Sequence, residues 1–113
     1  MEIDRLMIDY GDNVFYTKKF MDVLEAHMPY LRTSSKTLKI TVDLNDAYIY
    51  DSDFFGYLNK RNIQVKYHWI FMRVNNFYSP MEFNPDILSL LVPNEQEISQ
   101  IRNTYSSSGL INF

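Results

Sequence analysis

The sequence predicts a small α+β domain in which two short helices pack against a two-stranded sheet, with one more helix on either side. Three observations lead to this prediction. Residues 37–42 alternate apolar and polar side chains, as a half-buried strand does. Residues 87–92 form a mostly apolar run of strand length that stops at Pro93. Around these strands, apolar residues recur at helical spacing in four segments, at about 13–28, 54–62, 67–76 and 94–105.

The composition limits the classes of protein to which the chain can belong. With 113 residues, 46% of them hydrophobic, the chain is long enough for one core. Along it we expect an N-terminal helical arm at 1–36, a central domain at 37–105 and an apolar tail at 106–113. The net charge is −3 and no basic cluster is present, so we expect no nucleic-acid partner. No apolar run approaches the roughly 18 residues of a membrane span, and the first residues lack a signal-peptide pattern, so we expect no membrane partner.

The N-terminal helix is expected over about residues 13–28. Pro29 should end it, because a residue that precedes proline avoids the helical conformation. His27 lies in the last turn and is expected to be a cation that complements the helix dipole, or a plain surface residue, and not a ligand. The apolar side chains of this helix share one face: Tyr16, Phe20, Val23, Leu24 and Met28.

The first strand should turn Leu38, Ile40 and Val42 toward the core, because alternate side chains of a strand share one face. The polar residues 43–46 are typical of a turn. Residues 47–50 are then expected to continue as an extended segment.

Two short helices should follow. Residues 51–53 offer side-chain oxygens that can cap the first, and Asn62 favours the left-handed conformation that ends a helix. Residues 67–76 also suit a strand, but their spacing favours a helix. In this helix Trp69 is expected to be buried between the helices and the sheet. Its expected neighbours are Ile40, Leu58 and Leu90.

The sequence contains no group of residues that we would assign to catalysis. Cysteine is absent, which excludes a thiolate metal site and a cysteine nucleophile. His27 and His68 lie 41 residues apart, and no metal-ligand spacing or Gly-rich phosphate loop is present. His68 is expected to be a half-exposed packing residue, and Glu97 to complement the dipole of the last helix, which Asn94 caps. We therefore expect neither an enzyme nor a cofactor.

The segment from Tyr67 to Pro93 carries the most informative pattern. An aromatic–Trp–aliphatic helix ends in Asn-Asn, a loop with two prolines follows, and an aliphatic strand closes on Val-Pro. After a strand and a short helix, this pattern resembles the LysM domain, and more closely the LysM-like small baseplate wedge proteins of contractile-tailed bacteriophages. The resemblance covers about half of the chain. The positions that match the core of the motif are Phe54, Leu58, Trp69, Asn75, Val92 and Pro93.

The same resemblance implies an alternative function, a module that binds peptidoglycan. LysM domains that bind glycan hold it in two loops, which match residues 51–54 and 83–86 here. The loops depart from the family, because the first lacks its glycine and the second has Pro85 and Asp86 before the last strand. On this hypothesis the glycan-binding residues are Asp51, Ser52, Asp53 and Asn84.

Tyr, Phe and Trp make up 16% of the chain, more than a small core can hide, which points to protein contacts. The resemblance implies a structural subunit of a phage tail baseplate, assembled in the host cytoplasm, repeated in a symmetric particle and bound to other virion proteins. The apolar tip is expected to enter a groove on a neighbouring subunit, or to fold back onto the last helix near Ile101. A small protein-binding regulator is a third hypothesis. The expected interface residues are Tyr78, Leu110, Ile111 and Phe113.

Overall fold

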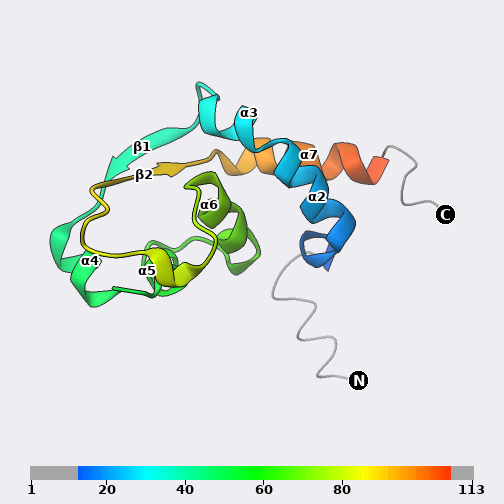
Figure 1. Cartoon of the computed structure of the whole chain (residues 1–113). Coiled ribbons are helices and arrows are strands. Elements are labelled where there is room, and N and C mark those ends of the chain that lie inside the picture. Colours follow the sequence, from blue (N-terminus) through cyan, green and yellow to red (C-terminus); the bar gives the residue numbers. More distant parts are fainter. Residues whose placement is uncertain (1–12, 108–113) are drawn as a thin grey trace, which may run out of the picture.

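A computed structural model describes residues 13–107, and their fold is α+β, as predicted (Figure 1). The described part of the chain contains six α-helices, three short 3-10 helices and one two-stranded sheet. The expected interface residues Leu110, Ile111 and Phe113 lie outside it. In chain order the elements are η1 Asn13–Tyr16, α2 Lys18–Ala26, α3 Met28–Thr33, β1 Leu38–Thr41, α4 Leu44–Ile49, α5 Phe54–Lys60, η2 Val65–Tyr67, α6 His68–Val74, η3 Pro80–Glu82, β2 Ser89–Val92 and α7 Glu95–Ser107.

The two predicted strands pair with each other, in antiparallel register from Leu38 opposite Val92 to Thr41 opposite Ser89. The backbone N–H of Val42 extends the ladder by donating to the carbonyl of Leu88 at 3.0 Å. Val42 is buried and Ile40 is half-buried. Leu38 lies on the same side as Ile40, toward α5 and α6, but it is 62% exposed and is therefore not part of the buried core. Leu38 begins the strand at one end of the ladder, where its side chain lies mostly open to solvent.

The outer edge of β2 is covered by one side chain, that of Asn75 at the end of α6. Its amide oxygen accepts a hydrogen bond from the N–H of Leu91 at 2.7 Å, and its nitrogen donates to the Leu91 carbonyl at 2.9 Å. The same nitrogen donates to the carbonyl of Phe71 at 2.8 Å. The amide of Asn75 therefore pairs with the backbone of β2 as a neighbouring strand would, and it joins α6 to the sheet.

The N-terminal helix is interrupted at His27, and Pro29 lies in the first turn of a second helix, α3. The prediction of one helix that Pro29 ends is therefore wrong. Proline disrupts a helix interior, but its missing N–H has no cost in the first turn. Arg32 of α3 donates to the carbonyls of Val74 and Arg73 at 3.1 and 2.8 Å, and so caps the C-terminal end of α6 with a positive charge.

Three α-helices, and not the two expected, lie between the strands. The additional helix is α4, where a turn and an extended segment were predicted. Asp43 caps it by accepting from the N–H of Asp46 at 3.3 Å, and Ala47 is its one buried residue. An aspartate such as Asp43 is common both in turns and at the start of helices, so residues 43–46 were predicted as a turn although a helix begins there. Asn62 has the predicted left-handed backbone, with φ 65°.

The core is rich in aromatic side chains. One group of rings, Phe54, Tyr57, Phe77 and Phe83, packs below the sheet, and Phe15 and Phe20 join Tyr67 and Tyr105 in a second group. In Figure 1 the sheet, α4 and α5 lie at one end of the molecule, and α2 and α7 at the other. The described part of the predicted N-terminal arm is thus packed into the same core as the central domain.

Two aromatic side chains of α6 differ from prediction. Trp69 is half-buried, not buried, and its indole N–H donates to the carbonyl of Phe15 at 3.2 Å. It therefore connects α6 to the N-terminal segment. His68 is buried, not half-exposed, and its Nε2 bonds to the carbonyl of Ile63 at 2.9 Å. Burial lowers the pKa of His68 and favours the neutral imidazole.

Asn75→Ala removes three hydrogen bonds and leaves both backbone groups of Leu91 without their partner. We expect it to lower the free energy of unfolding by about 2–3 kcal/mol, because unpaired backbone groups at a covered edge keep their desolvation cost. Urea denaturation measures this. Asn103→Ala, at an exposed position of α7, is the control and should change stability by less than about 0.5 kcal/mol. Equal effects of the two substitutions would contradict the role of Asn75.

Candidate functional site

The two histidines, which are the side chains best suited to acid–base catalysis, form hydrogen bonds to nearby backbone carbonyls. His27 is exposed and its Nδ1 bonds to the carbonyl of Val23 at 2.8 Å, while His68 is buried as described above. Within residues 13–107, no cluster of three or more His, Asp or Glu side chains has an arrangement that could hold a metal ion. No helix in this part of the chain is long and apolar enough to cross a membrane.

The residues that match the LysM motif lie around the sheet and the helices beneath it. Phe54, Leu58 and Pro93 are buried, and Trp69, Asn75 and Val92 are half-buried. A cavity of about 140 Å³ lies between β1, β2 and the helices α5 and α6. Four of the six motif residues line it: Phe54, Leu58, Asn75 and Val92.

The two loops expected to hold a glycan do come together. The N–H of Ser52, whose φ is 65°, donates to the carbonyl of Phe83 at 2.7 Å. Their side chains are used locally, however: Asp53 caps α5 by accepting from the N–H of Gly56 at 3.0 Å, and a Cβ at Gly56 would collide with that carboxylate.

The remaining glycan candidates form similar local contacts. Asn84 accepts from the N–H of Asp86 at 2.8 Å and donates to the carbonyl of Glu82 at 2.9 Å. Asp51 accepts from the hydroxyl of Ser52 at 3.5 Å. None of these side chains lines the cavity below the sheet or the larger cleft described next.

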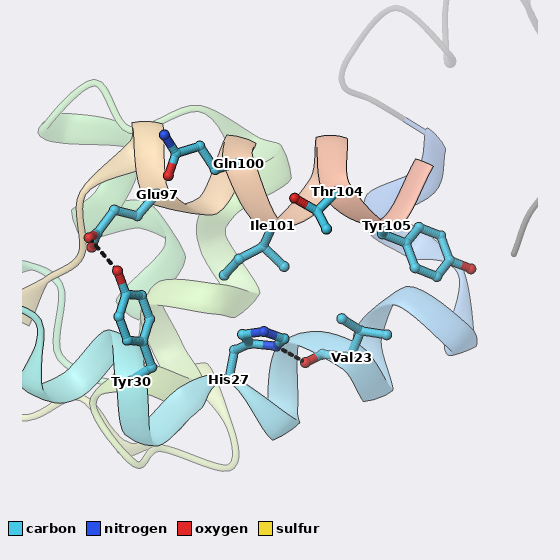
Figure 2. A pocket seen from close by; sticks show the side chains of 8 residues that line it. All are labelled: Val23, His27, Tyr30, Glu97, Gln100, Ile101, Thr104 and Tyr105. Atoms are coloured by element: carbon cyan, nitrogen blue, oxygen red, sulfur yellow. Dashed lines mark hydrogen bonds between the residues drawn. The ribbon is translucent and has the colours of Figure 1, made fainter. Parts of the chain in front are cut away.

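The larger cleft, of about 380 Å³, lies between α7 and the helices α2 and α3 (Figure 2). One wall is a stripe of α7 whose residues lie three and four positions apart. The other wall is formed by α2, by His27 between α2 and α3, and by α3. The lining residues are Glu97, Gln100, Ile101, Thr104 and Tyr105 on α7, and Val23, His27 and Tyr30 opposite. Figure 2 shows Ile101 pointing from α7 toward the opposite wall.

A buried carboxylate closes one end of this cleft. Glu97 is 6% exposed and accepts hydrogen bonds from the hydroxyl of Ser34 at 2.8 Å and from that of Tyr30 at 2.8 Å. These bonds, that of Ser34 first, hold the pKa of Glu97 below its usual value, and the bond to Glu97 raises the pKa of Tyr30. Both groups are thus held in the protonation states that they have at neutral pH. At the other end, the rings of Phe20 and Tyr105 touch, with centroids 5.2 Å apart.

Tyr78, the described member of the predicted interface residues, is an exposed ring that its neighbours hold in place. Its side chain is 80% exposed, and the guanidinium of Arg73 lies 4.7 Å from the ring centroid. Its backbone N–H donates to the carboxylate of Glu82 at 2.8 Å. Arg73 is itself fixed, because it donates to Glu25 at 2.7 Å and to the carbonyl of Phe77 at 2.9 Å. The hydrogen bond to Glu25 raises the pKa of Arg73 further.

No known protein family, curated protein or solved structure matches this chain. The functional assignment must therefore come from the residues and their geometry.

The sequence predicted Tyr78 as an interface residue and Asn75 as a motif residue, and it did not predict the cleft or the contacts of Glu97 with Tyr30 and Ser34. Glu97 does lie in the first turn of α7, where Asn94 accepts from its N–H at 3.1 Å, as the capping pattern predicts. Its partners Tyr30 and Ser34 precede it by 67 and 63 positions, and no local pattern indicates such a distant contact.

Glu97→Gln should make stability less dependent on pH in the acidic range. The pKa of Glu97 in the folded state lies below its ordinary value of 4.5, so the carboxylate stabilises the fold above that pH, and this contribution is lost as the pH falls through the folded-state pKa. Urea denaturation from about pH 7 to about pH 3 measures this effect. Glu97→Gln should have a lower free energy of unfolding than the parent at neutral pH, and the difference between the two proteins should shrink as the pH falls.

Glu95→Gln, in the same turn of α7, is the control for this experiment. Its free energy of unfolding should differ little from that of the parent, and this difference should not shrink on acidification as it does for Glu97→Gln. A Glu97→Gln curve parallel to that of the parent over the whole range would contradict the assignment.

Proposed function

We propose that the protein is a structural subunit of the tail baseplate of a contractile-tailed bacteriophage, which joins neighbouring virion proteins by direct contact. The observation that carries the proposal is Tyr78, a large aromatic side chain that is exposed and yet fixed. Anchors of protein interfaces are typically Tyr, Trp and Arg residues, and a side chain that is ordered before binding loses little entropy on binding. Tyr78 and Arg73 together fit this description.

Helix α4 offers a second contact surface. It buries Ala47 alone, while Leu44, Tyr48 and Ile49 are exposed, Ile49 by 70%. Lys60 of α5 forms an ion pair with Asp46, which holds α4 against its neighbour. A subunit that joins several proteins needs more than one binding surface, and exposed apolar side chains on a fixed helix suit that purpose.

The resemblance to the LysM-like baseplate proteins supports the same proposal. The two described strands pair with each other, and Asn75 of the motif bonds to the second of them. Three α-helices lie between the strands, one more than the resemblance implies. The proposal requires no catalytic group and no cofactor.

The proposal is tested by deleting the gene from a phage that encodes this chain and examining the particles by electron microscopy. We expect particles without functional tails, and mass spectrometry of purified wild-type tails should detect the protein in stoichiometric amounts. Normal infectious particles after the deletion, or tails that lack the protein, would overturn the proposal.

Tyr78→Ala, supplied in trans to the deletion phage, should reduce the yield of infectious particles at least about tenfold, because an interface anchor of this kind contributes more than about 1.4 kcal/mol. The thermal midpoint of the purified variant should stay close to that of the parent, since the ring is exposed. Tyr16→Ala, which removes another exposed tyrosine, is the matched control and should restore infectivity. Equal yields from both variants would exclude Tyr78 as an anchor.

Isothermal titration with chitin oligomers and muropeptides tests the peptidoglycan alternative. We expect no binding tighter than about 1 mM, because the side chains of Asp53 and Asn84 are engaged in local hydrogen bonds and the loop glycine of the family is missing. Micromolar binding that Asp53→Ala or Asn84→Ala weakens would favour the peptidoglycan-binding module instead.

A further inference from the structure

The cleft between α7 and the α2–α3 pair is a gap between elements that touch at both of its ends. Tyr30 bonds to Glu97 at one end, and the rings of Phe20 and Tyr105 meet at the other. Between these contacts, Val23 and Ile101 line opposite walls and stay half-buried (Figure 2). The cleft is therefore mostly apolar toward the C-terminal end of α7 and polar toward its beginning.

The volume of the cleft suits a small number of apolar side chains. A cavity of about 150 Å³ accepts a group of the size of benzene, so the cleft, at about 380 Å³, has room for at least two such groups. Six residues follow Ser107, the last residue of α7, and three of them are large and apolar: Leu110, Ile111 and Phe113. The composition of this segment thus matches the cleft.

The segment is also long enough to return to the cleft. Six extended residues span about 20 Å, whereas the seven positions from Ser107 back to Gln100 rise about 10 Å along α7. Gly109 allows the reversal of direction that such a return requires, because glycine adopts positive φ without strain. A tether this short gives an effective concentration in the millimolar range, far above that of other copies in a dilute solution.

We propose that Leu110, Ile111 and Phe113 bind in this cleft of their own chain, against Val23, Ile101 and Tyr105. Of the two destinations that the sequence leaves open for the apolar tip, the cleft thus favours the second. This inference is independent of the proposed baseplate function, because it concerns the isolated chain.

Disulfide trapping tests the proposal, and the absence of cysteine from the chain makes the two introduced thiols the only ones. The test variant is His27→Cys/Asn112→Cys, with one thiol at an exposed position of the cleft wall and the other between the apolar residues of the tip, which stay intact. The control is Ala26→Cys/Asn112→Cys, because Ala26 is also exposed and adjacent in sequence but does not line the cleft. A disulfide requires Cβ atoms within about 4 Å, so its rate of formation reports proximity.

At low protein concentration we expect the His27→Cys pair to form a monomeric disulfide at least about tenfold faster than the control pair, as judged on non-reducing gels. Adding Leu110→Ser and Ile111→Ser should abolish this advantage, because it removes the apolar groups that bind. In the cysteine-free chain, the same two serine substitutions should lower the thermal midpoint by about 4 °C or more.

Three results would overturn the proposal. Equal rates in the two cysteine pairs mean that the tip does not enter the cleft. A disulfide-linked dimer whose yield rises with concentration means that the occupant is a second copy. A further double variant, His27→Cys/Ile8→Cys, tests the N-terminal segment. If this variant forms a disulfide and His27→Cys/Asn112→Cys does not, the N-terminal segment fills the cleft instead.

Discussion

A sheet of two four-residue strands is too small to be stable alone, so the fold depends on how its open edge and its apolar face are covered. The open edge of β2 is covered by the amide of Asn75, which pairs with both backbone groups of Leu91. Because Asn75 ends α6, this contact also fixes the distance and the orientation of α6 relative to the sheet. Arg32 caps the same end of α6 from α3, so the end of one seven-residue helix joins the sheet to the N-terminal helices.

The two kinds of surface in this molecule differ in how they are prepared for binding. Tyr78 is held by Arg73, and Arg73 is held by Glu25 of α2, so the position of an exposed ring depends on a helix that begins sixty positions earlier in the sequence, at Lys18. The cleft along α7, in contrast, is bounded by contacts at its ends and open between them. The first surface suits contact with a protein of complementary shape, and the second suits a short apolar segment.

The sequence predicted the secondary structure best where a residue type favours one backbone conformation. An asparagine after a helical segment indicates a helix end, and Asn62 and Asn76 both have φ 65°. The alternation in the first strand, and the strand length of the apolar run that stops at Pro93, predicted the sheet correctly. Among the predicted motif residues, Phe54, Leu58 and Pro93 are buried.

Prediction failed where tertiary contacts decide between local alternatives. Six residues with a capping aspartate become α4 because Ala47 is buried and Lys60 pairs with Asp46, and both contacts come from other elements. Trp69 turns toward the carbonyl of Phe15 and away from full burial, because the N-terminal segment packs beside α6. The cleft could not be predicted at all, since its walls are separated by about seventy positions and neither wall has an unusual pattern by itself.

The pairing of β1 with β2 has a consequence for how the chain reaches this structure. The two strands meet across the whole of residues 42–88, so their hydrogen bonds form only after a loop of that length has closed. Closing such a loop costs entropy that four ladder positions repay poorly, and distant pairings of this kind slow folding relative to helical bundles. We therefore infer that α5 and α6 collapse around their aromatic side chains before the two strands meet.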